Sequence, residues 1–321
     1  MDENRTHFKK GGGSSPYEHC VLCPRRCGAD RTGRMRGYCG MGAEASVSRV
    51  SLHMWEEPCI SGTRGSGTVF FSGCSLGCIY CQNSSIVSGN IIPGGGRDLP
   101  LGRTVTAEEL AEIFFRLEEK GAHNVNLVTA AHFLPHVREA LARAKSGGLG
   151  IPVVYNTSGY ESAESLRHLQ GLVDIYLTDF RYIRPDTASK YSRAPDYPAA
   201  AKQALDEMTR QGALHFSEDG MLLSGTLVRV LLLPGHVREA CEILHFLHER
   251  YGDGIYVSLL SQYTPLHAAA SDPLLKRKVT RREYGRLIQC ALDLGMERVY
   301  IQEGSSAGES FIPVFDGGEY L

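Results

Sequence analysis

The sequence predicts an α/β fold built on an incomplete, TIM-like (β/α)6 barrel with a small cysteine-rich extension before it. From Val69 onward, short apolar runs rich in β-branched residues alternate with segments that carry apolar residues at helical spacing. This alternation is typical of βα units and a parallel sheet. Seven of the ten cysteines lie in two clusters, one ahead of this region and one at its start. A chain of 321 residues with 42% hydrophobic residues is long and apolar enough to bury a full core.

Seven segments have the length and the composition of buried strands. They cover residues 69–72, 125–129, 152–156, 173–178, 225–232, 254–260 and 298–302. Six of them begin βα units and the last extends the sheet. Since a closed barrel of this type needs eight strands, we expect this one to stay open.

Helical patterns separate the strands. The first helix is introduced by Thr106 and Glu109, which form a capping box ahead of apolar residues at helical spacing. The other predicted helices cover residues 133–145, 162–169, 197–211, 237–250 and 281–294.

Composition limits the partners and the compartment. The formal net charge of −2 gives no reason to expect a nucleic acid or an anionic membrane as partner. The first residues contain no apolar leader and no stretch of about 18 apolar residues occurs. We therefore expect a cytoplasmic protein whose thiols stay reduced, so that clustered cysteines indicate metal binding.

The second cysteine cluster has the spacing C-x3-C-x2-C, formed by Cys74, Cys78 and Cys81. Structural zinc and cubane iron-sulfur clusters usually take four protein ligands, so three thiolates leave one coordination position open. Gly73 and Gly77 permit the tight backbone that a loop around a metal cluster needs. The triplet therefore predicts a metal centre at which chemistry occurs.

The first cluster contains Cys20, Cys23, Cys27 and Cys39, with spacing C-x2-C-x3-C-x11-C. Four thiolates can close a tetrahedral zinc site, which would stabilise a segment too short to form its own core. They can equally hold a second iron-sulfur cluster. Spacing does not separate zinc from this second cluster, and both remain open.

Polar residues follow the predicted strands at their carboxyl ends, where the functional groups of parallel barrels gather. These strand-end residues include Thr129, Asn156, Ser158, Asp179, Arg181, Arg229 and Gln262.

The cysteine triplet with Tyr80 before Cys81 resembles the cluster-binding loop of radical S-adenosylmethionine (SAM) enzymes. The resemblance implies a 4Fe-4S cluster on Cys74, Cys78 and Cys81, with SAM on the open iron. An electron from a flavodoxin- or ferredoxin-type donor would cleave SAM to methionine and a 5′-deoxyadenosyl radical, which abstracts a hydrogen atom from the substrate.

The strand ends and the sequence Tyr80-Cys81-Gln82-Asn83 are most similar to activating enzymes of glycyl-radical enzymes, in particular the pyruvate formate-lyase activating enzyme-like proteins with an N-terminal four-cysteine motif. The resemblance implies SAM contacts from Tyr80, Asn83, Thr129, Asn156, Ser158, Asp179, Arg229 and Gln262. It also implies that Asp179 and Arg181 act in catalysis beside the three cysteines. Thr129 stands where the family commonly has Gly-Gly-Glu, so its hydroxyl or nearby carbonyls would have to bind the SAM amino group.

Two alternatives to an activating enzyme stay open. The radical could act on a peptide side chain or a small metabolite, because fold alone does not identify a substrate. The chain could also be a non-catalytic iron-sulfur or zinc module. We divide the sequence into a disordered start (1–16), a metal-binding extension (17–60), the radical SAM partial barrel (61–304) and a C-terminal tail (305–321).

Overall fold

The main feature of the protein, in a computed structural model that describes residues 15–87, 91–92, 102–302 and 315, is one mixed β-sheet. The described strands are β1 (Ala45–His53), β2 (Ser66–Phe71), β3 (Arg103–Val105), β4 (Val125–Val128), β5 (Val153–Thr157), β6 (Ile175–Asp179), β7 (His215–Phe216), β8 (Leu222–Leu231), β9 (Tyr256–Leu260) and β10 (Val299–Ile301). Their order is β10-β9-β8-β6-β5-β4-β2-β1-β3, and β7 pairs with β8 outside this path.

Seven strands of the sheet are parallel, from β2 through β4, β5, β6, β8 and β9 to β10. They correspond to the seven predicted strands, so the expected parallel sheet is confirmed. Neighbours in this sheet follow one another along the chain, and the path does not return to its first strand. The sheet is therefore open, as expected of a partial barrel.

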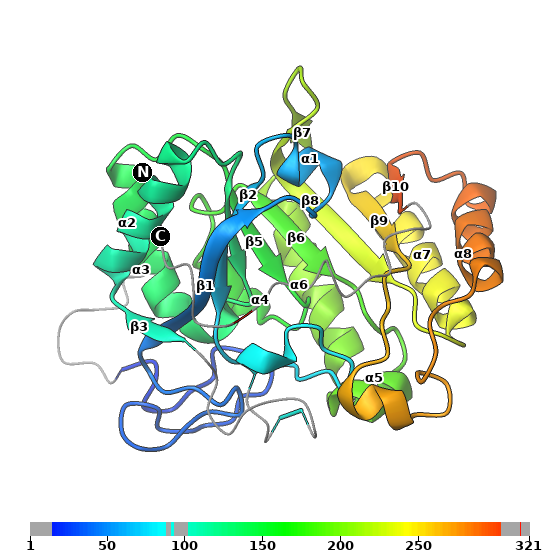
Figure 1. The fold of residues 1–321 in the computed structure, drawn as a ribbon, viewed down its shortest axis with the longest axis horizontal. Helices are drawn as coiled ribbons and strands as arrows, with labels where there is room; N and C mark the ends of the chain where they lie inside the picture. Colours follow the sequence, from blue (N-terminus) through cyan, green and yellow to red (C-terminus); the bar gives the residue numbers. More distant parts are fainter. Residues whose placement is uncertain (1–14, 88–90, 93–101, 303–314, 316–321) are drawn as a thin grey trace.

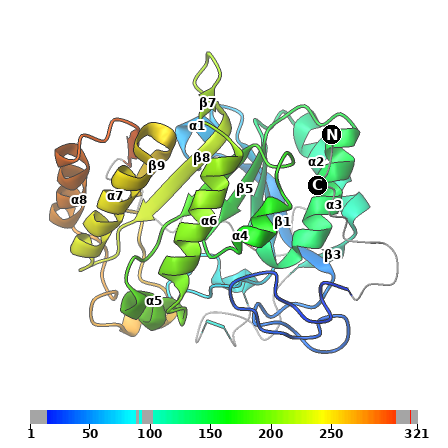
Figure 2. The ribbon, with the colours of Figure 1, turned by 180° about the vertical axis from the view of Figure 1, so that it is seen from behind.

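Most of the helices pack on one face of the sheet, whereas the short α1 packs against strand residues of the other face. Figure 1 shows the strands in front of α4 and α6, and Figure 2 shows these two helices in front of the strands. The described helices are α1 (Pro58–Ser61), α2 (Ala107–Glu119), α3 (Leu134–Ser146), α4 (Ala163–Arg167), α5 (Pro185–Ser192), α6 (Tyr197–Gln211), α7 (Val237–Tyr251) and α8 (Arg281–Asp293). Short 3-10 turns cover Ser84–Ile86, Ala131–Phe133, Gly252–Gly254 and His267–Ser271.

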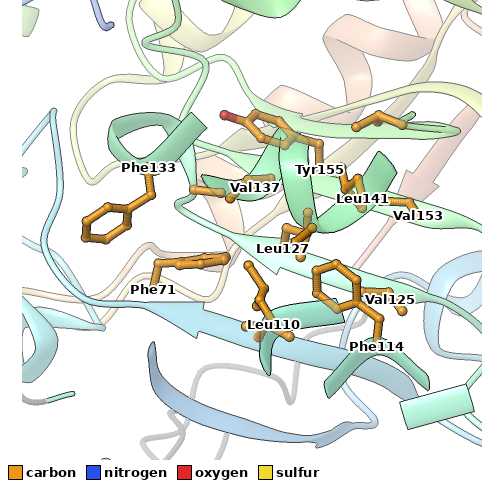
Figure 3. Close-up of a cluster of buried hydrophobic side chains, with 14 of the residues drawn as sticks. Phe71, Leu110, Phe114, Val125, Leu127, Phe133, Val137, Leu141, Val153 and Tyr155 are labelled. Carbon is orange, nitrogen blue, oxygen red and sulfur yellow. The ribbon is translucent and has the colours of Figure 1, made fainter. Parts of the chain in front are cut away.

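The predicted capping box begins α2. The hydroxyl of Thr106 accepts from the Glu109 amide at 3.1 Å, and the Glu109 carboxylate accepts from the Thr106 amide at 2.8 Å. Helix α2 then places Leu110 and Phe114 against the sheet, where both are fully buried. Figure 3 shows them beside residues of β4 and α3 in one apolar cluster. This packing holds the strand that leads into the cysteine triplet.

Strands β1 and β3 were not predicted. Strand β1 lies antiparallel to β2, and β3 lies antiparallel to β1. A register shift between Val47 and Arg49 interrupts the regular pairing of β1, and Val50 beyond it is fully buried like Val47. A bulge of this kind shifts the two-residue alternation by which a strand is predicted.

The predicted extension of residues 17–60 needs a correction because of β1. Residues 45–53 are a strand of the main sheet, so the described cysteine-rich segment without regular structure covers residues 15–44. Both ribbon views place this segment at the bottom, beside the loop after β2. The predicted disordered start and C-terminal tail lie outside the described residues, apart from residues 15, 16 and 315. None of the described helices is long and apolar enough to cross a bilayer.

Candidate active site

The cysteine triplet lies in the loop that leaves the carboxyl end of β2. Gly73 and Gly77 have φ values of 84° and 69°, in the region that favours glycine. A Cβ on Gly77 would lie 2.1 Å from a methyl carbon of Ile91, so a side chain at this position would collide with that residue. The loop thus turns back on itself and brings Cys74, Cys78 and Cys81 to one side of the sheet edge.

Hydrogen-bond donors surround the sulfur atoms of this loop. The Cys78 Sγ accepts from Ser192 Oγ at 3.1 Å and from Arg181 Nη1 at 3.7 Å. The Cys74 Sγ accepts from the Leu76 amide at 3.4 Å. Burial, reinforced by the other two thiols, raises the pKa of Cys81 to about 12. Hydrogen-bond donors to sulfur stabilise the thiolate form of a cysteine, which is the form that binds a metal.

A cavity of about 190 Å³ opens beside the loop. Eight predicted site residues line it together, namely Tyr80, Cys81, Asn83, Asn156, Asp179, Arg181, Arg229 and Gln262. They come from the cysteine loop and from the carboxyl ends of β5, β6, β8 and β9. The parallel order of the strands places these ends side by side, as predicted for the strand-end residues.

Four charged side chains form a connected network in the wall of this cavity. Arg229 donates from Nε to Asp179 at 2.8 Å, from Nη1 to Glu56 at 3.1 Å and from Nη2 to the Asn156 amide oxygen at 2.7 Å. Arg181 forms a second ion pair with Asp179. Burial raises the pKa of Asp179, but the guanidinium groups of Arg229 and Arg181 outweigh it, so this pKa lies below its ordinary value. Asp179 is therefore ionised at neutral pH and holds both arginines in place.

A chain of hydroxyl groups joins the side chain of Tyr80 to the sulfur atom of Cys78. The Tyr80 and Tyr182 hydroxyls are 2.6 Å apart, and the Tyr182 hydroxyl lies 2.8 Å from Ser192 Oγ, which donates to Cys78. The Arg181 guanidinium lies 5.9 Å from the centre of the Tyr80 ring. This contact orients the ring that borders the cavity.

Comparison with known proteins identifies the family of this site. A family model described as "Radical SAM superfamily" matches residues 68–247. The chain belongs to the radical SAM superfamily. The match covers more than half of the sequence and contains the cysteine triplet together with Asn156, Asp179, Arg181 and Arg229. It confirms the family that the cysteine spacing predicted.

Two relatives extend this comparison. "Uncharacterized protein MJ0674" of Methanocaldococcus jannaschii is 27% identical over 287 residues, which cover 88% of this chain and 77% of that protein. Among solved structures, Streptococcus suis SuiB bound to precursor peptide SuiA has 11% identity and a TM-score of 0.48 over 73% of this chain and 47% of SuiB. SuiB bound to S-adenosylmethionine has 13% identity and a TM-score of 0.45, over 72% of this chain and 45% of SuiB. The chain spans about half the length of these SuiB chains.

The residues of the loop suit the 4Fe-4S cluster that the radical SAM superfamily implies. Cys74 Sγ has an amide donor, and Cys78 Sγ has a hydroxyl and a guanidinium donor; hydrogen bonds of this kind stabilise the thiolates of an iron-sulfur cluster. Cys81 borders the cavity, so a cofactor in the cavity could reach a metal held by the loop. Cys74, Cys78 and Cys81 would hold the cluster.

Two predicted SAM contacts of this radical SAM enzyme are not brought to the cavity. Thr129 and Ser158 are absent from its described lining. Thr129 has φ +62°, and its amide donates to the Asn156 carbonyl at 2.9 Å. The Ser158 carbonyl accepts from the Tyr197 hydroxyl at 2.8 Å. Both residues follow strands whose ends reach the cavity, since Val128 of β4 and Asn156 of β5 line it, and their contacts with SAM stay predictions.

Three lining residues that sequence reasoning did not assign follow or end β1, and a fourth lies in the cysteine loop. They are His53, Trp55, Glu56 and Gln82. Glu56 accepts from Asn126 and Asn156 at 3.1 Å each, in addition to Arg229. Glu56 follows β1, and without β1 its place beside the cavity could not be predicted.

None of the N-terminal cysteines lines the cavity. Cys20, Cys23 and Cys39 are buried and Cys27 is exposed. Burial is the main reason why the pKa of Cys23 rises to about 12, and the nearby Cys39 and Cys20 thiols raise it further. In the described ranges, no three His, Cys, Asp or Glu side chains are arranged to hold a single metal ion as they stand, and this holds for these four cysteines and for Cys74, Cys78 and Cys81 alike.

A buried arginine accompanies these cysteines. Arg31 is 1% exposed and donates to Cys20 Sγ at 3.4 Å and to the His132 carbonyl at 2.8 Å. Its other acceptors are the carbonyls of Met41 and Gly42. Among the described residues, none of its hydrogen-bond acceptors is a carboxylate. A guanidinium stays charged when buried, and a buried charge without an opposite charge nearby is costly. Negative charge on the neighbouring sulfur atoms would balance it.

Proposed function

We propose that this radical SAM enzyme abstracts a hydrogen atom from a glycine of a partner polypeptide, in the manner of a glycyl-radical activating enzyme. The observation that carries the proposal is the single cavity that combines Cys81 with the network of Glu56, Asp179, Arg181 and Arg229. The pair Asp179 and Arg181 corresponds to the acidic-x-basic pair of activating enzymes, with arginine in place of the more common lysine.

A 4Fe-4S cluster on Cys74, Cys78 and Cys81 would supply the electron that cleaves SAM to methionine and a 5′-deoxyadenosyl radical. The residues around it bind and orient. Arg181 Nε is buried and, among the described residues, has no acceptor, so it can donate to a carboxylate or carbonyl of a ligand. Asn156 is fixed through its amide by Glu56 and Arg229 and presents a rigid polar edge to the ribose.

The mouth of the cavity favours a polypeptide as substrate. Trp55 lines the cavity and is 64% exposed. An exposed aromatic side chain beside a cavity is typical of surfaces that bind another chain. A small metabolite would leave this side chain in water, so we rank a metabolite substrate second.

We further propose that Cys20, Cys23, Cys27 and Cys39 bind zinc or a second iron-sulfur cluster. Arg31 supports this assignment, because four thiolates around either centre carry a net negative charge that would balance its buried guanidinium. Metal binding would displace the protons that burial otherwise keeps on Cys23 and Cys39.

The function is tested by reconstituting the protein anaerobically with iron and sulfide and measuring 5′-deoxyadenosine released from SAM after reduction. We expect release by the wild type and by Cys290→Ala, whose thiol lies in α8 away from the cavity, and none by Cys78→Ala. Iron, sulfide and zinc counted in the wild type and in Cys20→Ala/Cys23→Ala identify the second centre. Release of no deoxyadenosine by the loaded wild type would favour a non-catalytic module.

The substrate is tested with a candidate partner protein labelled with α-deuterated glycine. We expect deuterium in the released 5′-deoxyadenosine and a doublet signal in electron paramagnetic resonance. Deoxyadenosine without deuterium and without a protein radical, for every partner tried, would exclude the activating role and direct the search to peptide side chains and metabolites.

A further inference from the structure

Arg25 joins the two cysteine sites. It lies midway between Cys23 and Cys27 in the sequence and is half-buried. Its guanidinium donates to the carbonyls of Ser75 at 2.9 Å and Leu76 at 3.0 Å, which lie inside the loop between Cys74 and Cys78. One side chain from the N-terminal segment thus fixes the backbone of the radical SAM loop.

The same guanidinium also holds the end of α5. It donates to the Ser192 carbonyl at 2.8 Å and to the Arg193 carbonyl. A cation at the carboxyl end of a helix satisfies carbonyl groups that lack partners within the helix. The guanidinium lies 4.0 Å from the centre of the Tyr38 ring, which keeps it flat against the N-terminal segment.

The end of α5 in turn contacts the cluster ligands. Ser192 donates from Oγ to Cys78 Sγ at 3.1 Å, and the Ile79 amide donates to the Tyr191 carbonyl at 2.9 Å. Arg25 therefore holds both partners of the contact between Ser192 and Cys78. A displacement of Arg25 would loosen the loop and remove the donor from the sulfur atom.

The backbones of the two cysteine segments also meet directly. The Cys74 amide lies 3.4 Å from the Cys39 carbonyl, to which it donates. A Cβ on Gly73 would lie 2.7 Å from that carbonyl oxygen. The space between the segments thus admits no side chain at residue 73, and movement of one segment must move the other.

We propose that Arg25 is a positioning residue through which a metal at Cys20, Cys23, Cys27 and Cys39 stabilises the 4Fe-4S cluster on Cys74, Cys78 and Cys81. The inference rests on the proposed function for both sites. A metal bound by Cys23 and Cys27 fixes the chain on both sides of Arg25. Because the metal has already ordered this segment, the Arg25 guanidinium can bind its four carbonyls at a smaller cost in conformational entropy.

The test measures how fast reconstituted protein loses cluster iron to an excess of an iron chelator, followed by the visible absorbance of the cluster. Arg25→Gln is compared with Arg26→Gln, since Arg26 is exposed and adjacent. Losing the equivalent of one hydrogen bond costs about 1.4 kcal/mol, which is a factor of about ten. We expect cluster loss about tenfold faster in Arg25→Gln and unchanged in Arg26→Gln.

A double-mutant cycle tests the route. Cys27→Ser removes the exposed ligand of the N-terminal site and should also accelerate cluster loss. If the metal acts through Arg25, the double variant Arg25→Gln/Cys27→Ser should lose its cluster no faster than the faster of the two single variants. Rates that multiply in the double variant, or an Arg25→Gln rate equal to that of Arg26→Gln, would overturn the proposal.

Two further measurements keep the result interpretable. Arg25→Lys retains the charge but not the several donors of the guanidinium, so its rate of cluster loss should lie between those of the wild type and Arg25→Gln. Arg25→Lys also replaces Arg25→Gln in the test if the latter does not fold. A shift of the electron paramagnetic resonance signal of the reduced cluster in Arg25→Gln would show the changed surroundings of Cys78. If the wild type itself assembles no oxygen-sensitive cluster, the proposed function and the role of Arg25 both fail. If it assembles the cluster and Arg25→Gln loses it no faster than Arg26→Gln, only the role of Arg25 fails.

Discussion

Replacing Arg229 by methionine should remove the centre of the cavity network while keeping a side chain of similar length. Arg229 makes three side-chain hydrogen bonds, to Glu56, Asp179 and Asn156. Its side chain is 16% exposed, and those of Glu56 and Asp179 are 10% and 14% exposed. Removing one partner of a buried ion pair costs about 3 to 5 kcal/mol, because the remaining charge stays buried.

The two carboxylates would not suffer equally. Asp179 keeps its ion pair with Arg181, whereas the donors that Glu56 keeps among the described residues are the amides of Asn126 and Asn156. We therefore expect the free energy of unfolding to fall by about 3 kcal/mol, at the lower end of the range. Arg229→Lys retains the charge but not the three-way geometry and should cost roughly half as much.

The assay is urea denaturation followed by circular dichroism at pH 7, on proteins with equal cluster content. Arg143→Met is the matched control, because the Arg143 side chain is 44% exposed and its two ion-pair partners, Glu139 and Glu108, are 48% and 68% exposed. Exposed pairs contribute about 1 kcal/mol or less. A loss in Arg229→Met no larger than that in Arg143→Met would refute the reasoning that the network is desolvated and depends on this arginine.

Two further predictions concern the cluster and the response to acid. Ser192→Ala removes the hydroxyl that donates to Cys78 Sγ, and this donor stabilises the extra negative charge of the reduced cluster. The loss of about 1 kcal/mol should lower the midpoint potential of the cluster by about 40 mV. An unchanged potential in a redox titration would contradict this. Burial and then Arg31 lower the pKa of His132 to about 3, so the folded state keeps this residue neutral while the unfolded chain binds a proton below about pH 6.5. The contribution of neutral His132 to the free energy of unfolding is thus complete above pH 6.5 and falls by about 2 kcal/mol by pH 5. In urea titrations at both pH values, the free energy of unfolding of His132→Gln should fall less than that of the wild type.

The parallel sheet was predictable because its signals are local. Each of its strands is a short apolar run, and the helices between them show helical spacing or explicit caps such as Thr106 with Glu109. The cysteine triplet was predictable for the same reason, since its ligands lie within eight consecutive residues. Asn156, Asp179 and Arg229 could be placed at the cavity because parallel strands bring their carboxyl ends to one edge.

Features that depend on distant partners were missed. Strand β1 is recognised only through its pairing with β2, and its bulge hides the alternation. Glu56 follows β1 and could not be assigned without it. Arg25 is one of many arginines in the sequence, and nothing local shows that its acceptors lie more than 160 residues away at the end of α5. Thr129 follows β4 with a positive φ of 62°, which no sequence pattern around it indicated, and its SAM contact stays a prediction.

The contacts of Arg25 also set an order of events during synthesis. The three cluster ligands leave the ribosome with Cys81, whereas the acceptors Ser192 and Arg193 follow roughly 110 residues later. At about 5 to 20 residues per second, this interval lasts roughly 5 to 20 seconds. During that time the thiols of the nascent chain have neither α5 nor its serine beside them. Iron and sulfide delivered before the end of α5 emerges would meet a loop that still lacks the contacts of Ser192 and Arg193.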